Sequence, residues 1–109
     1  MKVAVAKEGS IVAEHFGHCH EYALFTVEDG KITEEKTLTA PEHAPGVIPK
    51  FLNENGANVV LAGGMGQGAI NFFNEFGIDV YIGVCGSIED AMKKFLDGSL
   101  VSGQNVCDH

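Results

Sequence analysis

The order of expected strands and helices limits what this chain can fold into more than any other feature of its sequence. A short buried strand is expected at 2–6, and two further strands at 21–28 and 31–38. The dipeptide Asp29-Gly30 between the last two favours a tight turn. These two strands should therefore form an antiparallel hairpin.

From residue 47 onward the pattern changes to an alternation of helices and strands. The expected helices carry apolar residues at helical spacing, and the strands between them are short apolar runs. The helices are expected at 47–55, 68–76 and 87–96, and the strands at 58–62 and 80–84. Helical crossovers connect parallel strands, so the sheet should be mixed. We expect an α/β fold with three α/β/α layers and a mixed five-stranded sheet, in a single domain over 1–109.

The charge and cysteine content of the chain exclude several classes of partner and environment. The sequence has 15 acidic and 7 basic residues and a net charge of -8. Nucleic acids and anionic membranes attract clustered Lys and Arg, so we expect neither as a partner. Cys19, Cys85 and Cys107 are odd in number and widely spaced, which is typical of reduced cytosolic thiols. With no apolar stretch near membrane-spanning length, a cytoplasmic protein is expected.

The strongest chemical signal is the segment His15-Phe16-Gly17-His18-Cys19-His20. It holds four of the chain's 8 Cys and His residues, where a random window of six would hold about 0.4. Imidazole and thiolate together favour zinc, copper, iron or iron–sulfur units over hard cations. The spacing does not match a zinc finger. We expect His15, His18, Cys19 and His20 to include two or three metal ligands, the alternative being exposed histidines around a buried, inert cysteine.

Three loops should meet at one edge of the sheet, because ligands of such folds gather beyond the carboxyl ends of parallel strands. They follow the strands at 2–6, 58–62 and 80–84 and carry the His-rich segment, a glycine cluster and a cysteine. The candidate cofactor-binding residues on the last two loops are Gly63, Gly64, Gly66, Gly68 and Cys85.

The glycine cluster also fits a loose dinucleotide fingerprint, Gly64-x-Gly66-x-x-Ala69. That site needs an acidic residue about 20 positions on, where this chain has Ile82 to Cys85. Backbone N–H groups near a helix N-terminus would instead suit an anion or a cluster sulfide. Close packing of strand and helix is the alternative explanation of the glycines.

The chain closes with Cys107-Asp108-His109. Cys107 and His109 are candidate metal ligands if this end folds back onto the core, and a frayed, nonfunctional terminus is the alternative.

The His15-Phe16-Gly17 segment with Tyr22, the Gly63–Ala69 segment and the order of elements together resemble a known family. It is the dinitrogenase iron-molybdenum cofactor biosynthesis family of NifX/NifB-like proteins, and the resemblance covers nearly the whole chain. It implies a ribonuclease H-like fold with strand order 3-2-1-4-5. It also implies binding or carrying of iron–sulfur or iron–molybdenum clusters, without catalysis in most members. Many relatives carry non-ligand residues at the positions of His18, Cys19 and His20, so their presence here indicates a variant metal site.

The leading hypothesis is a noncatalytic carrier of an iron–sulfur or iron–molybdenum cluster or its precursor, with cluster donor and recipient proteins as partners. His15, His18 and Cys19 are the first expected ligands. One alternative is a mononuclear zinc or copper binding module. The other is an enzyme that uses Cys85 or Cys19 as a thiolate nucleophile.

Overall fold

The computed structural model describes residues 1–42, 44 and 46–102, apart from the side chain of His18. Its first half is an antiparallel unit of β1 (Lys2–Glu8), β3 (Glu21–Glu28) and β4 (Lys31–Thr39). β3 pairs antiparallel with both β1 and β4, which confirms the expected hairpin. The turn between β3 and β4 places Asp29 and Gly30 at φ 53° and 75°, a left-handed conformation that Gly and Asp tolerate better than most residues.

The second half alternates as expected. Its elements are α1 (Val47–Glu54), β5 (Val59–Leu61), α2 (Gln67–Phe76), β6 (Asp79–Tyr81) and α3 (Ile88–Asp97). β5 pairs parallel with β1, and β6 pairs parallel with β5. The sheet is therefore mixed. Ser87 caps α3, because its hydroxyl oxygen accepts a hydrogen bond of 3.0 Å from the N–H of Asp90.

Among the described residues the sheet has six strands, and the prediction of five was wrong. The additional strand is β2 (Ile11–Val12), which folds back antiparallel onto the end of β1. Two residues are too few to carry an alternating pattern, so β2 could not be recognised in the sequence. The main path of the sheet is β4-β3-β1-β5-β6, and with β2 set aside its strands follow the chain order 3-2-1-4-5. The ribonuclease H-like classification stays a prediction.

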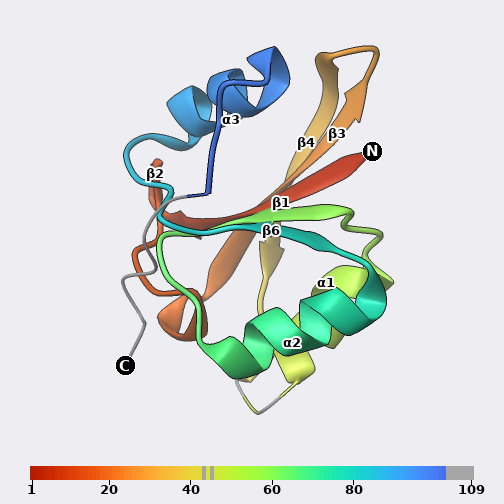
Figure 1. Cartoon of the computed structure of the whole chain (residues 1–109), viewed down its shortest axis with the longest axis vertical. Coiled ribbons are helices and arrows are strands. Elements are labelled where there is room, and N and C mark those ends of the chain that lie inside the picture. The colour runs from red at the N-terminus through yellow and green to blue at the C-terminus, as the bar shows by residue number, and fades with distance from the viewer. Residues whose placement is uncertain (43, 45, 103–109) are drawn as a thin grey trace.

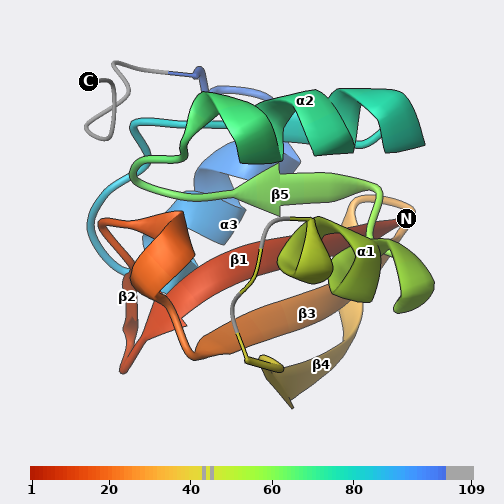
Figure 2. The ribbon, with the colours of Figure 1, turned by 90° about the horizontal axis from the view of Figure 1, so that it is seen from below.

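Helices cover both faces of the sheet, in three layers (Figures 1 and 2). α1 and α2 lie on one face, where Leu52 and Phe73 are fully buried. α3 lies on the other face and buries Ala91 and Met92. β1 is the central strand between them, and its residues contribute alternately to the two cores: Ala4 and Ala6 to the first, Val3 and Val5 to the second. None of the helices in the described part of the chain is both apolar and long enough to cross a membrane.

Candidate functional site

Backbone hydrogen bonds join the three loops that follow β1, β5 and β6. The N–H of Gly63 donates to the carbonyl of Ala13 over 3.1 Å, and the N–H of Gly83 donates to the carbonyl of Gly63 over 2.6 Å. A third bond of 2.9 Å runs from the N–H of Val12 to the carbonyl of Gly86. The predicted convergence of these loops is confirmed, and it depends on main-chain groups rather than on side chains.

Gly63 must be a glycine because the first loop passes directly against it. A Cβ atom at this position would lie 2.8 Å from the carbonyl oxygen of Glu14 and 2.9 Å from its Cα. Both are backbone atoms, which cannot move aside without shifting the loop. Packing therefore explains this glycine.

Packing does not explain Gly68. A Cβ at Gly66 or Gly68 would meet no atom within 4 Å. Gly66 is the N-cap of α2, a position that accepts glycine. Gly68 lies inside the first turn of α2, where alanine would be better by about 1 kcal/mol. The surrounding space and the helix thus give no reason for glycine at position 68.

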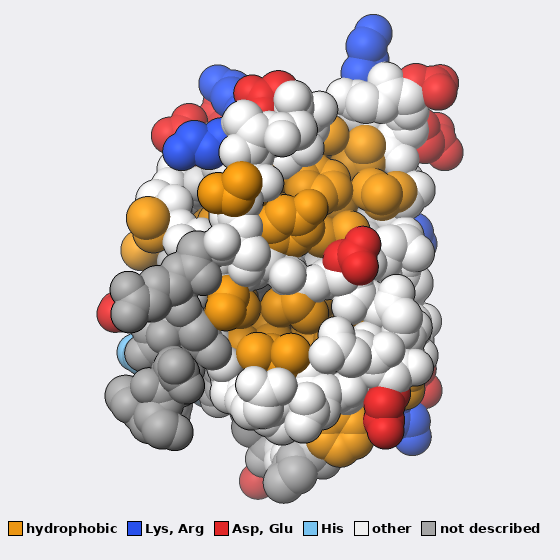
Figure 3. Space-filling model, in the orientation of Figure 1, with side chains coloured by type: hydrophobic (Ala, Val, Ile, Leu, Met, Phe, Trp, Pro, Cys, Tyr) orange, Lys and Arg blue, Asp and Glu red, His pale blue; other side chains and the backbone are white. Residues whose placement is uncertain are grey.

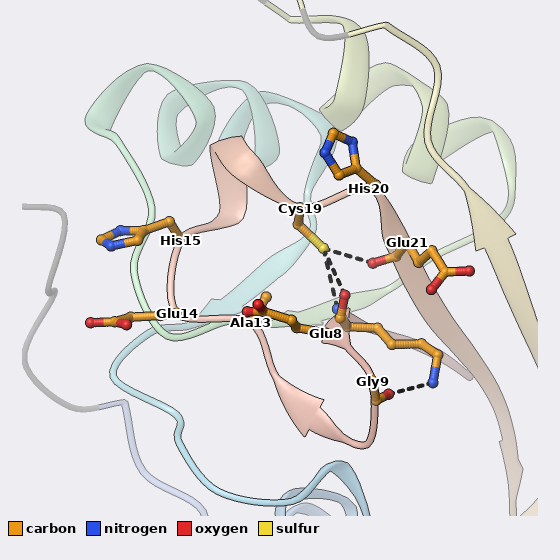
Figure 4. A pocket seen from close by; sticks show the side chains of 9 residues that line it. Glu8, Gly9, Ala13, Glu14, His15, Cys19, His20 and Glu21 are labelled. Carbon is orange, nitrogen blue, oxygen red and sulfur yellow. Dashed lines mark hydrogen bonds between the residues drawn. The ribbon is translucent and has the colours of Figure 1, made fainter.

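His15 is attached to the glycine loop through its backbone. It forms an isolated parallel bridge with Gly64, and the next N–H, that of Phe16, donates to the carbonyl of Gly64 over 2.8 Å. The His15 side chain is half-buried. Its ring points away from Cys19 and from His20, which is exposed (Figure 4). The backbone of His18 lies in the short helix η1 (Phe16–His18), and its side chain lies outside the described residues.

Cys19 is buried and bonded to the main chain. Its Sγ atom accepts from the N–H of Lys7 over 3.3 Å and lies 3.3 and 2.7 Å from the carbonyl oxygens of Lys7 and Glu21, to which the thiol can donate. Burial raises the pKa of the Cys19 thiol above its ordinary value. In this conformation the residue ties the end of the His-rich segment to β1 and β3. Its assignment as a metal ligand stays a prediction.

Two aromatic rings hold the same segment from the other side. The ring of Phe16 packs against Tyr22, with 5.4 Å between centroids, and edge-on against Phe73 at 5.6 Å. The hydroxyl of buried Tyr22 donates to the carbonyl of Phe16 over 3.2 Å. Burial also raises the Tyr22 pKa, so the phenol stays protonated. Phe16 and Tyr22 thus position the His-rich segment.

Glu14 lines two of the cavities in the described part of the chain. The first, of about 470 Å³, is lined by His15, Cys19 and His20, among others (Figure 4). The second, of about 410 Å³, lies between the three loops and is lined by Ile11, Val12, Glu14, Gly63, Gly83, Val84, Cys85 and Gly86. Cys85 is exposed there, as a binding role requires. Glu14 was not among the predicted site residues, because its place between the loops depends on strand β2, which is too short to be recognised in the sequence.

No three His, Cys, Asp or Glu side chains are grouped to hold a metal ion within residues 1–42, 44 and 46–102. Cys107 and His109 lie outside the described residues. The structure joins the backbones of His15, the glycine loop and the Cys85 loop, but His15 lines the cavity that Cys19 and His20 line and not the cavity that holds Cys85. The metal-ligand assignments stay predictions.

Residues 1–98 match a family model described as dinitrogenase iron-molybdenum cofactor. One relative, the uncharacterized protein MJ0580 of Methanocaldococcus jannaschii, is 31% identical over 105 residues, which cover 92% of this chain and 89% of that protein. The crystal structure of PH0822 superimposes with a TM-score of 0.87 at 32% identity, over 99% of this chain and 96% of the other. The apo form of the orange protein from Desulfovibrio gigas shares the fold, with a TM-score of 0.79 at 22% identity over 95% and 93%.

Replacing Gly63 should separate the loops. We expect Gly63→Ala to lower the free energy of unfolding by about 1–3 kcal/mol, because its Cβ meets the Glu14 backbone. Gly68→Ala is the matched control and should be neutral or slightly stabilising. Chemical denaturation of both variants measures this. Equal stability of the two variants would contradict the assigned role of Gly63.

The described cysteines should differ in reactivity. At pH 8 we expect iodoacetamide to alkylate exposed Cys85 and to spare Cys19, whose buried thiol has a raised pKa and little thiolate. Peptide mapping by mass spectrometry compares the two rates. In denaturant both should react alike, and fast native alkylation of Cys19 would show that the site is more open than described.

Proposed function

The chain belongs to the dinitrogenase iron-molybdenum cofactor family, and on that premise we propose that it is a noncatalytic carrier of an iron–sulfur or iron–molybdenum cluster or a precursor of one. The cluster is its cargo, held where the loops after β1, β5 and β6 meet. The partners of the chain are the proteins that donate and receive the cluster, and the chain acts in the cytoplasm.

The observation that carries this proposal is the attachment of His15 to the glycine loop. The His15–Gly64 bridge ties the backbone of His15 to the loop that leads into α2, and Cys85 lines the cavity next to Gly63. An imidazole, a thiol and exposed backbone N–H groups are the donors that suit iron, molybdenum and sulfide ligands. The donor chemistry of the edge therefore fits such a cargo.

Gly68 supports a ligand at the start of α2, where it lines a cavity of about 180 Å³ together with Phe16 and Gly17. Glycine there costs helix stability and relieves no clash, so its benefit lies outside the fold itself. Because position 68 has no side chain, a bulky ligand can approach the main chain of the first turn of α2 closely. The N–H groups of that turn have no partners within the helix and carry the positive end of its dipole.

This arrangement also reconciles an anionic cargo with an acidic protein. Metal–sulfide clusters carry negative charge, the chain has a net charge of -8, and Glu14 lines the cavity. Local N–H dipoles act at short range and offset the charge of Glu14, whereas the charges of carboxylates beyond the cavity are screened by salt. We therefore assign retention to soft donors and main-chain groups, and only a minor part to lysine side chains.

Anaerobic reconstitution tests the proposal. Protein is incubated with ferrous iron and sulfide, or with tetrathiomolybdate, then desalted and examined by elemental analysis and absorption spectroscopy. We expect the native chain to retain metal with a sulfide-to-metal absorption band. His15→Ala should lower retention at least about tenfold, as loss of a metal-site residue generally does. Gly68→Ala should lower retention without loss of stability.

His20→Ala is the comparison variant, because His20 lines the same cavity while the ring of His15 points away from it (Figure 4). It should retain metal like the native chain. If the native chain retains none of these species, the carrier proposal fails for them. If only zinc or copper is retained, the chain is a mononuclear metal module instead. Equal losses in the two histidine variants would contradict the placement of the site.

A further inference from the structure

The cavity between the three loops has a one-sided distribution of charge. Most of its lining is neutral, because it consists of glycines and of the apolar side chains of Ile11, Val12 and Val84. Cys85 contributes an exposed thiol. Among the described residues that line this cavity, Glu14 has the one carboxylate and none has a basic side chain. A ligand that enters therefore meets a single negative charge among neutral groups.

The backbone on both sides of Glu14 is bonded to the glycine loop. The N–H of Gly63 donates to the carbonyl of Ala13 over 3.1 Å, and His15 forms a parallel bridge with Gly64. The side chain of Glu14 is exposed and points in the same direction as the ring of His15 (Figure 4). The loop that lines the cavity thus fixes the backbone from which this carboxylate projects.

The other charges of the chain are spread over its surface. The net charge is -8, and on the face shown in Figure 3 most charged side chains lie toward the margin, around hydrophobic ones. Fields between exposed charges are largely screened beyond about 8 Å at physiological salt. A charge at a cavity with apolar walls is screened less. The local potential at the Cys85 thiol should therefore follow the charge of Glu14.

We propose that Glu14 is a specificity-determining residue, whose carboxylate favours cationic over anionic species in the cavity that Cys85 lines. A ferrous ion is attracted by this charge, whereas an anion such as tetrathiomolybdate is repelled. The preference lowers the affinity for anions without excluding them, because main-chain N–H groups offset part of the charge.

The inference rests on the proposed function only for the identity of the natural cargo. Among the species considered there, it assigns ferrous iron as the one that this cavity prefers. The preference itself applies to any small ion or reagent that reaches Cys85, so it can be measured without a cluster.

The Cys85 thiol can report this preference. The full chain is treated with two methanethiosulfonate reagents of similar size, one carrying a trimethylammonium group and the other a sulfonate. The thiolate attacks the sulfenyl sulfur, a disulfide forms and methanesulfinate leaves. Peptide mapping by mass spectrometry follows Cys85 alone. Both reagents act on the same thiolate, so the ratio of the two rates, relative to an uncharged cysteine peptide, reports the local potential.

We expect the native chain to react faster with the cationic reagent at low salt. A unit charge about 8 Å away in water changes each rate by a factor of about 2.4, so Glu14→Gln should lower the cationic-to-anionic ratio about fivefold. Glu14→Asp keeps the charge and should keep the preference. In 1 M salt, where charges are screened within about 3 Å, the native chain and Glu14→Gln should react alike.

Glu21→Gln is the matched control, because Glu21 lines the cavity of Cys19 and His20 but not that of Cys85. It should leave the ratio at its native value. The inference is overturned if Glu14→Gln leaves the ratio unchanged, if Glu21→Gln lowers it equally, or if the native chain shows no preference. Circular dichroism verifies that each variant is folded.

Reconstitution distinguishes failure of this inference from failure of the carrier proposal. If both hold, Glu14→Gln retains less ferrous iron and more tetrathiomolybdate than the native chain. If the ratio of rates responds to Glu14 while the native chain retains no iron or molybdenum species, the carrier proposal fails and the charge preference stands. If the native chain retains them and the ratio does not respond, the carrier stands and this inference fails.

Discussion

The approach of Gly63 to the backbone of Ala13 and Glu14 is the contact on which the carboxyl edge of this sheet depends. A Cβ at Gly63 would lie within 3 Å of Glu14, and its N–H and carbonyl bond to the loops on either side. Because these bonds join main-chain groups, the convergence of the three loops depends on no side chain and requires only that position 63 has none.

The His-rich segment divides into buried residues that anchor it to the core and two more exposed histidines, His15 and His20. Phe16 and Tyr22 pack against the core, and the buried Cys19 thiol joins the segment to β1 and β3. His15 is fixed between this anchored turn and the glycine loop. In the proposed carrier, a ligand donor held on two sides would lose little conformational entropy on binding, which would favour retention of the cargo.

Most of the fold could be predicted from the sequence, because the spacing of apolar residues and the turn residues indicate where helices, strands and turns lie. The hairpin at Asp29-Gly30 and the later alternation were recognisable, whereas β2 is two residues long and is specified by its pairing with β1. The site was harder to predict from the sequence than the fold. Loop convergence followed from topology, but the burial of Cys19 and the place of Glu14 depend on tertiary contacts that residue type does not encode. Cys19 is buried and His20 is exposed, as the alternative interpretation of the His-rich segment predicted.

The central claim is that cargo binds where the three loops meet, and nuclear magnetic resonance tests it most directly. Amide ¹H–¹⁵N spectra of the labelled chain are compared before and after addition of tetrathiomolybdate. We expect the largest changes in amide chemical shift at Glu14 and His15, at Gly64 to Gly68, and at Gly83 to Gly86. Unchanged spectra, or shifts confined to the β3–β4 hairpin or the outer surface of α3, would contradict it.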